Sequence, residues 1–244
     1  MSLLRLIARL DIKGQNVVKG VQMEGLRVVG KPEVLAKKYA EEGADELIYL
    51  DIVASLYGRN QLGPLLERTT QDVFIPVTVG GGIKSRADVK RLLDAGADSV
   101  AVNTAAIRNP SLIKELSEYY GSQAVVVSIE AKKCDADWIC LTDCGREKSG
   151  KYARQWAEEA VQLGAGEILL TSVDNDGTQK GFDLDLVKSL AHLPVPVVAA
   201  GGCGTTFHVE QAISSGADAV AIGSALHYGR ISFPEMRQSL GHRV

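Results

Sequence analysis

One long segment of the sequence occurs twice. Residues 77–106 (VTVGGGIKSRADVKRLLDAGADSVAVNTAA) match residues 197–226 (VVAAGGCGTTFHVEQAISSGADAVAIGSAL) at an offset of 120 residues. Residues 43–50 (GADELIYL) likewise match residues 164–171 (GAGEILLT) at an offset of 121 residues. Because each offset is about half of the 244-residue chain, the sequence predicts two similar halves related by a pseudo-twofold axis.

Within each half, short runs rich in β-branched residues alternate with longer amphipathic stretches. The short runs lie at residues 4–10, 47–51, 76–80, 99–103, 124–130, 167–171, 196–200 and 219–223. The amphipathic stretches include residues 32–42, 85–95, 110–120, 152–163 and 207–215, and we expect Ser85 and Thr206 to cap two of these helices. Eight strands with crossover helices are typical of an α/β (β/α)8 TIM barrel. We therefore expect a single domain over residues 1–244, made of two half-barrels, with a doubly wound open sheet as the alternative.

The composition is that of an ordinary globular protein. Hydrophobic residues make up 45% of the chain, and 27 Lys and Arg against 30 Asp and Glu give a net charge of −3. This mild acidity offers no basic field for nucleic acid or for a membrane surface. The apolar stretch at residues 3–10 is short and contains Arg5 and Arg9, so it predicts neither a signal peptide nor a transmembrane span. We expect a cytoplasmic protein.

The cysteines and histidines predict no metal site. The four cysteines show no C-x-x-C spacing, and so few in a chain of this length are expected to be reduced thiols. They are Cys134, Cys140, Cys144 and Cys203. The four histidines are scattered along the chain, at His192, His208, His227 and His242. We expect no metal and no cofactor.

Glycines and small polar residues recur at the predicted carboxyl ends of the strands, where barrel enzymes have their active sites. The first half brings Gly82, Asn103 and Thr104 to this edge, and the repeat brings Gly202 and Ser224. Such glycines let backbone N–H groups approach an anion, and the helix that follows adds positive potential. One such cup is equally consistent with a tight turn, but two related cups predict a substrate with a phosphate at each end. The loop at residues 174–178 can add donors to one of them, with Asp176 and Gly177 as candidates.

Two carboxylates lie between the predicted cups. Asp11 ends the first predicted strand and Glu130 ends the fifth, and these strands face each other across an eight-stranded barrel. Paired carboxylates beside an elongated substrate suit general acid–base catalysis. Lys19, just after the first strand, can neutralise developing charge or serve as a surface lysine. Further polar residues at strand ends are Asp51, Thr78 and Thr171.

Motifs along the whole chain resemble one family. They include RLIARLDIK (5–13), VVKG (17–20), DELIYLDIVAS (45–55), VGGGI (79–83), NTAA (103–106), NPSLI (109–113), GSQAVVV (121–127), GAGEILLTSVD (164–174) and DGT (176–178). Together they look like the cyclase subunits of imidazole glycerol phosphate synthase. A sibling isomerase of the same pathway is similar in fold and substrate, but residues 19–32 and 121–127 fit the cyclases better.

The resemblance implies an enzyme of histidine biosynthesis with a glutaminase subunit as its partner. Such cyclases use ammonia to convert a bis-phosphorylated ribulosyl-formimino-aminoimidazole-carboxamide ribonucleotide into imidazole glycerol phosphate and aminoimidazole carboxamide ribonucleotide. By this resemblance Asp11 is the essential acid–base residue. The substrate-side groups are Lys19, Asn103 and Thr171, and the phosphate contacts are Gly82, Thr104, Asp176, Gly177, Gly202 and Ser224. The face that docks the glutaminase carries Arg5, Glu46, Asp98 and Glu167, with a gate for ammonia around Arg5, Glu46 and Glu167.

The chain departs from the family pattern at four positions. Glu130 stands where the family has its second catalytic aspartate, and Arg9 stands where it has a small residue. Ala200 replaces a serine near the site, and Ser99 replaces the lysine of the gate, which predicts a looser ring with one fewer positive charge. Two other functions therefore stay open: a paralogue that uses glutaminase-derived ammonia in another pathway, such as amidine formation on a surface sugar, and a non-catalytic scaffold.

The alternation of side chains along a strand predicts what fills the barrel. With Asp11 facing inward, Arg9 and Ile7 also face inward, and Ser128 and Glu130 do so on the fifth strand. Many other inward positions carry small residues, which leave an ammonia passage or make room for Arg9 and Tyr49. A buried guanidinium needs a carboxylate partner. We expect Arg9 and Glu130 to form a buried pair that lowers the pKa of Glu130 and leaves most acid–base work to Asp11.

Overall fold

The described residues form a closed barrel of parallel strands. The computed structural model describes residues 4–54 and 62–241, so that His242 and one end residue of each of the segments 3–10 and 45–55 lie outside it. Within these ranges the barrel strands are β1 (Arg5–Lys13), β4 (Glu46–Asp51), β5 (Val77–Gly80), β6 (Ser99–Val102), β7 (Val125–Cys134), β10 (Glu167–Ser172), β11 (Val197–Ala200) and β12 (Ala219–Ile222). Each pairs in parallel with both neighbours, and pairing of β1 with β12 closes the ring. The (β/α)8 barrel is confirmed, and the open sheet is excluded.

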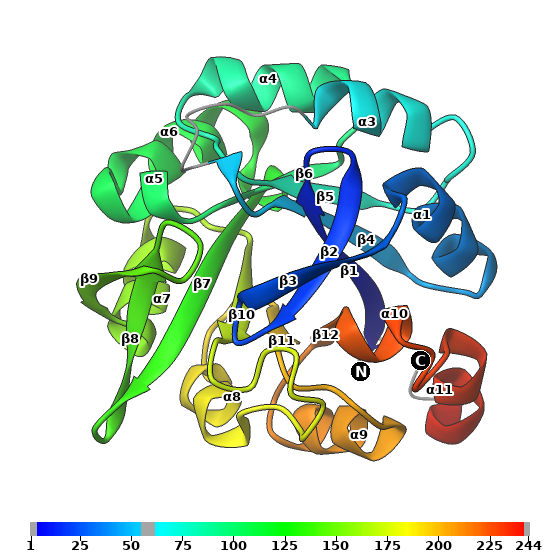
Figure 1. Cartoon of the computed structure of the whole chain (residues 1–244). Coiled ribbons are helices and arrows are strands. Elements are labelled where there is room, and N and C mark those ends of the chain that lie inside the picture. Colours follow the sequence, from blue (N-terminus) through cyan, green and yellow to red (C-terminus); the bar gives the residue numbers. More distant parts are fainter. Residues whose placement is uncertain (1–3, 55–61, 242–244) are drawn as a thin grey trace.

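Helices surround the barrel on all sides (Figure 1). Those described are α1 (Pro32–Glu41), α3 (Gly63–Thr69), α4 (Arg86–Asp94), α5 (Thr104–Arg108), α6 (Ser111–Tyr120), η1 (Ser122–Ala124), α7 (Ala153–Gln162), α8 (Leu184–Leu190), α9 (Thr206–Ser214), α10 (Ser224–His227) and α11 (Phe233–Leu240). Ser85 caps α4 as predicted, accepting a hydrogen bond from the N–H of Asp88. The cap of α9 is Thr205 and not Thr206, because Thr205 has the extended backbone of a cap whereas Thr206 is the first helical residue.

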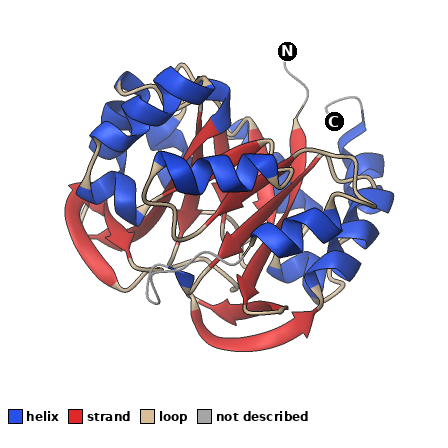
Figure 2. Cartoon of the chain, turned by 90° about the horizontal axis from the view of Figure 1, so that it is seen from above, coloured by secondary structure: helices blue, strands red, loops and turns tan. Residues whose placement is uncertain are grey.

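Two β-hairpins extend the barrel beyond the predicted strands. Residues after β1 form β2 (Asn16–Val21) and β3 (Glu24–Gly30), and residues after β7 form β8 (Asp137–Thr142) and β9 (Glu147–Tyr152). β1 and β7 are long because each continues past the barrel and pairs antiparallel with its hairpin. The view in Figure 2 places these strands on the side of the barrel opposite the start of β1. The hairpins therefore stand over the end of the barrel where the parallel strands finish.

Register places Asp11 and Glu130 at equivalent positions in the two halves. Asp11 pairs with Leu50 of β4, and Glu130 pairs with Thr171 of β10. Leu50 and Thr171 are themselves equivalent in the sequence repeat, at the offset of 121 residues. Both carboxylates thus lie before the ends of their strands, since β1 runs on to Lys13 and β7 to Cys134. The pseudo-twofold relationship holds at the centre of the molecule.

The apolar core has two parts. The larger part lies between strands and helices, and a smaller cluster fills the barrel interior with Ile7, Ile48, Leu50, Ala101, Val126, Leu169, Val198, Ala200, Ala219 and Ala221. Among the predicted inward positions with small side chains, this cluster confirms Ala101, Ala200, Ala219 and Ala221. Tyr49 was expected to face inward and does not: its hydroxyl lies 3.3 Å from the carbonyl of Pro32, in the helix layer. Because Ile48 and Leu50 face inward, alternation along β4 turns Tyr49 outward.

Candidate active site

A buried network of charges lies at the carboxyl end of the barrel. The Arg9 guanidinium donates from Nε to Oδ1 of Asp11 at 2.9 Å and from Nη1 to the hydroxyl of Thr171 at 2.8 Å. The Lys19 ammonium donates to Oδ2 of Asp11 at 2.8 Å and to both carboxylate oxygens of Asp176 at 2.9 Å. Arg9 is 4% exposed and Lys19 is 3% exposed. Two cations and two carboxylates therefore neutralise each other out of contact with water.

The network keeps Asp11 ionised. Burial by itself raises the pKa of Asp11, but the charges of Arg9 and Lys19 outweigh it and hold this pKa well below its ordinary value. Burial likewise opposes the charge of Lys19, and the carboxylates of Asp11 and Asp176 raise its pKa nonetheless. At neutral pH Asp11 is a carboxylate whose two oxygens each accept a hydrogen bond from a cation.

The expected partnership of Arg9 with Glu130 is wrong. Arg9 faces inward and is buried, as predicted, but its ion pair is with Asp11. Asp11 lies two residues along the same face of β1, within direct reach, whereas Glu130 approaches from β7 across the barrel. The direction of the pKa shift is also corrected: burial raises the pKa of Glu130 to about 7, and the charge of Arg9 offsets this only in part. Oε2 of Glu130 is buried and has no hydrogen-bond partner among the described residues.

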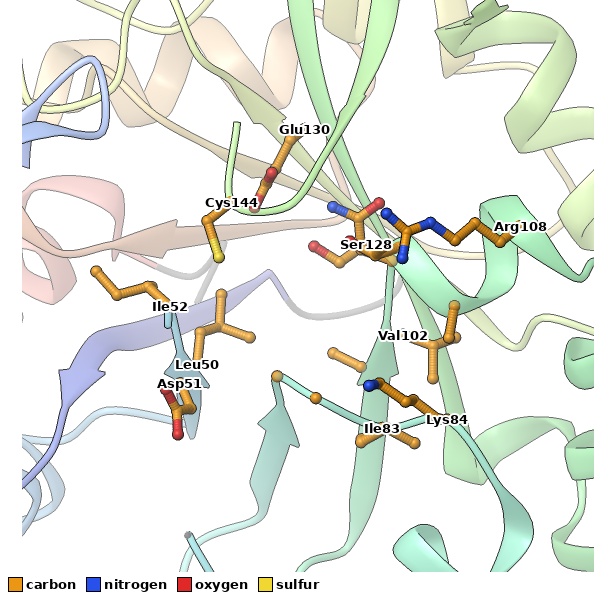
Figure 3. Close-up of a pocket in the computed structure, with 16 residues that line it drawn as sticks. Leu50, Asp51, Ile52, Ile83, Lys84, Val102, Arg108, Ser128, Glu130 and Cys144 are labelled. Atoms are coloured by element: carbon orange, nitrogen blue, oxygen red, sulfur yellow. The ribbon is translucent and has the colours of Figure 1, made fainter. Parts of the chain in front are cut away.

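The first predicted cup is an open cavity of about 160 Å³. Gly82, Asn103 and Thr104 line it, as the repeat predicted. Figure 3 shows Glu130, Arg108 and Lys84 around the same space, approaching from β7, from α5 and from the loop after β5. Lys84 and Arg108 add two positive side chains to the glycine and hydroxyl groups of the cup, although Arg108 also pairs with Asp143 at 2.7 Å. Oδ1 of Asn103 is buried and unpartnered within the described part of the chain, so it can accept a hydrogen bond from a ligand.

The second predicted cup is much tighter, with a cavity of about 10 Å³. Gly177, Gly202 and Ser224 line it together with Asp176. Gly202 has a φ of +105°, and an added Cβ would lie 2.0 Å from the carbonyl oxygen of Gly181, so that only glycine fits there. The Asp176 carboxylate holds Lys19 beside this cup. Asp176 thus contributes to the cup by placing the Lys19 ammonium there.

The hydroxyl groups of the two cups are arranged alike. Oγ1 of Thr104 accepts a hydrogen bond from the N–H of Asp143 at 2.9 Å. Oγ of Ser224 accepts one from the side-chain amide of Gln179, also at 2.9 Å. A hydroxyl that already accepts a hydrogen bond from the protein keeps its own proton available to donate. Both cups thus present an O–H donor to an anion.

A smaller polar ring lies at the opposite end of the barrel. Arg5 pairs with Glu46 at 2.9 Å and with Glu167. The hydroxyl of Thr78 donates to Glu46 at 2.6 Å and lies 2.7 Å from the hydroxyl of Ser99. One guanidinium thus faces two carboxylates, and Ser99 stands where the family pattern has the second cation. Asp98, expected on the same face, accepts a hydrogen bond from the backbone N–H of Val77 at 2.8 Å.

Several residues of the site were not predicted from the sequence. Lys84 lies inside the repeated segment at residues 77–106 and Arg108 lies two residues after it, and their equivalents at the offset of 120 residues are the uncharged Gly204 and Tyr228. A comparison of charges between the repeats would have found both. Gln179 has a φ of +59° and lies in a loop without a recognisable pattern, so the sequence held no signal for its contact with Ser224.

The described ranges contain neither a cluster of metal-binding side chains nor a helix that could span a membrane. Within residues 4–54 and 62–241, no group of three or more His, Cys, Asp or Glu side chains could hold a metal ion. The same part of the chain contains no helix that is long and apolar enough to span a membrane.

Fold and site together define a (β/α)8-barrel protein with a polar, partly buried pocket at the carboxyl ends of its strands. The chain matches the family model described as "Histidine biosynthesis protein" over residues 5–232, and it belongs to that family. It is 56% identical over 206 residues to the "Imidazole glycerol phosphate synthase subunit HisF" of Legionella pneumophila. The aligned residues make up 84% of this chain and 97% of that protein. It is 44% identical over 244 residues to the protein of the same name from Exiguobacterium sibiricum. The aligned residues make up 100% of this chain and 98% of that protein.

Proposed function

We propose that this chain is the cyclase subunit of imidazole glycerol phosphate synthase in histidine biosynthesis. The observation that carries the proposal is the pair of cups, related by the pseudo-twofold axis, with ionisable carboxyls between them. The reaction joins ammonia to a bis-phosphorylated ribulosyl-formimino-aminoimidazole-carboxamide ribonucleotide. It releases imidazole glycerol phosphate and aminoimidazole carboxamide ribonucleotide. The names of both relatives support the same function.

One phosphate of the substrate would occupy each cup. In the first cup, the hydroxyl of Thr104 and the backbone beside Gly82 are the donors, with Lys84 and Arg108 nearby. In the second cup, Ser224 and the backbone of Gly177 and Gly202 play the same part. Lys19 approaches the second cup from the side of Asp11. The middle of the substrate would then lie between Asp11 and Glu130, where a nitrogen nucleophile must arrive.

We infer that a glutaminase subunit docks on the end of the barrel that carries Arg5, Glu46 and Glu167. Charged residues at this end of a barrel usually serve stability and solubility. Here the ring instead closes around Thr78 and Ser99 at the entrance to the barrel interior, where the lining includes Ala101, Ala219 and Ala221. Such an entrance suits the delivery of ammonia.

A second function, transfer of ammonia to a different acceptor in another pathway, is favoured by one observation. Arg9 occupies the interior next to Asp11 and binds both Asp11 and Thr171. The family pattern has a small residue at this position. An acceptor with a different central region, such as a sugar that becomes an amidine, would meet this altered surface.

The deciding experiment supplies the purified chain with ammonium salt and the bis-phosphorylated substrate. Formation of both imidazole glycerol phosphate and aminoimidazole carboxamide ribonucleotide in equal amounts, followed by chromatography, supports the cyclase. Tight binding of the substrate without turnover would contradict it and favour the second function. If the chain neither binds the substrate nor turns it over, the assignment of the two cups as phosphate sites is contradicted.

A further inference from the structure

We propose that Glu130, rather than Asp11, is the carboxyl that exchanges a proton with the substrate, and that Arg9 is a positioning residue that holds Asp11 as a permanent carboxylate. This division of roles rests on the proposed function. It reverses the roles that the resemblance implies for the two carboxylates.

Both oxygens of Asp11 are already engaged. Oδ1 accepts from Arg9 at 2.9 Å, and Oδ2 accepts from Lys19 at 2.8 Å. The two cations are fixed in turn, Arg9 by the hydroxyl of Thr171 and Lys19 by Asp176. To take up a proton, Asp11 would have to leave a buried cation without its partner, which is strongly unfavourable. Asp11 can therefore orient charge in the site, but it is a poor proton carrier.

Glu130 has the opposite environment. Its Oε2 is buried and has no hydrogen-bond partner among the described residues, so the oxygen can hold a proton or accept one. Glu130 lines the first cup and also the narrower space next to Asp11, whereas Asp11 is absent from the described lining of the first cup. Figure 3 shows its side chain entering the open pocket beside Cys144. Of the two carboxyls, Glu130 is the one placed against the larger space for a ligand.

The charged groups that line the two cavities beside Glu130 come from seven parts of the fold. They are Arg9 and Asp11 on β1, Lys19 on β2, Asp51 on β4, Lys84 after β5, Arg108 on α5, Arg146 in the β8–β9 hairpin, and Asp176 after β10. Burial raises the pKa of Glu130; Arg9 and the N–H of Gly145 lower it, and Asp11 and Asp176 raise it again, with a result of about 7. A general acid–base group works best when its pKa lies near the working pH. Glu130 meets that condition.

The proton balance of such a step is simple. Protonated Glu130 gives its proton to the substrate atom that gains electron density when the ammonia nitrogen forms its new bond. The nitrogen then carries one proton too many and loses it to the Glu130 carboxylate. The residue ends as it began, and no further reactant is needed.

The test follows the ammonia-dependent kcat from about pH 5.5 to about pH 9, at a fixed concentration of free NH3, in the wild type and four variants. Glu130→Gln is expected to lose about 100-fold in kcat and to lose the inflection near pH 7. Asp11→Asn keeps the inflection but moves it to lower pH, because the charge of Asp11 raises the pKa of Glu130. Arg9→Met moves the inflection to higher pH, because the charge of Arg9 lowers the pKa of Glu130. Arg9→Lys, which keeps a positive charge, returns the inflection to its wild-type pH.

An inflection that survives in Glu130→Gln, or that disappears in Asp11→Asn alone, overturns the proposal. Carbon-13 NMR of glutamate carboxyls in the substrate-free wild type gives a second measurement that depends on neither variant folding nor turnover. A Glu130 resonance that titrates near pH 7 supports the proposal, and one that titrates near 4.5 overturns it. A wild type with no turnover of the bis-phosphorylated substrate contradicts the proposed function, whatever the NMR titration shows.

Discussion

Arg9 and Asp11 lie two residues apart on β1 and form an ion pair inside the barrel, with Nε and Oδ1 2.9 Å apart. Neighbouring side chains on one face of a strand are close enough for this pairing without any adjustment of the backbone. The pair stands where the family pattern has a small residue two positions before the carboxylate. It therefore changes the electrostatics of the site without removing the carboxylate itself.

Removing the guanidinium should destabilise the fold. Arg9→Met leaves Asp11 with a single cation and leaves the hydroxyl of Thr171 without its donor. Breaking a fully buried ion pair by removing one partner costs about 3–5 kcal/mol in the free energy of unfolding. Urea denaturation measures the change. The matched control is Lys90→Met, which breaks the exposed pair with Asp94 and should leave the unfolding curve close to that of the wild type. Equal curves for both variants would show that Arg9 does not contribute as a buried ion.

Glu130 should make the stability depend on pH. Its pKa is about 7 in the folded chain and is taken as the ordinary 4.5 in the unfolded chain. As the pH rises from 4.5 to 7, Glu130 loses its proton in the unfolded chain but keeps it in the folded chain. The unfolded chain is therefore favoured progressively over that interval. The free energy of unfolding falls over that interval by about 3 kcal/mol, at 1.36 kcal/mol per pKa unit. Glu130→Gln should flatten the fall. Parallel curves for the variant and the wild type across this pH range would be the contrary result.

The two hydroxyls should contribute to substrate affinity. Thr104→Val and Ser224→Ala each remove an O–H donor from a cup. A hydrogen bond to a charged group is worth about 1.5–3 kcal/mol, so each variant should raise KM about tenfold or more. Inorganic phosphate should inhibit the wild type competitively and inhibit the double variant less. Ser111→Ala at the start of α6 is the control, since its hydroxyl donates to Asn109 and Ser111 lines neither cup. An unchanged KM in both cup variants would argue against phosphate binding there.

Arg5 should affect the reaction rate with glutamine as the nitrogen source and not the rate with ammonium salt. Arg5→Ala leaves Glu46 and Glu167 without their shared cation at the entrance to the barrel. With a glutaminase partner, the glutamine-dependent rate should fall about tenfold, within the usual range of coupling free energies. The rate with ammonium salt should stay close to that of the wild type. Affinity for the partner should also decrease as salt is raised. If both rates fall together, Arg5 supports the fold of the barrel and not the delivery of ammonia.

The barrel was predictable because its signals are local and repeated. The strand at residues 99–102 and its equivalent at 219–222 consist of small and β-branched residues that are buried on both faces. Ser85 and Gly96 likewise mark the ends of α4 with standard helix signals. The hairpins gave no such signal: β3 is mostly exposed, and its residues alternate without a clear apolar face. Each hairpin pairs antiparallel with the part of β1 or β7 that continues past the barrel.

The positions of the candidate site residues were predictable, but their partners were not. Alternation along a strand places Arg9, Asp11 and Glu130 inside the barrel. Whether Arg9 turns toward Asp11 or reaches across to Glu130 depends on side-chain lengths and on Lys19, which arrives from a hairpin that the sequence analysis did not predict. The pKa of Glu130 was expected to fall for the same reason. An error in one contact reversed the direction of the shift.

The pairing of β1 with β12 has a consequence for synthesis of the protein. Arg5 to Ala8 of β1 bond to Ala219 to Ile222, more than 200 positions later in the chain. Contacts so distant in sequence form slowly, and a ribosome makes β12 after every other barrel strand. The second cup includes Ser224, two residues after the end of β12, so the site cannot be complete until the barrel has closed. During translation, β1 has an open edge that a chaperone or another nascent chain could bind, and recovery of substrate binding during refolding would report the moment of closure.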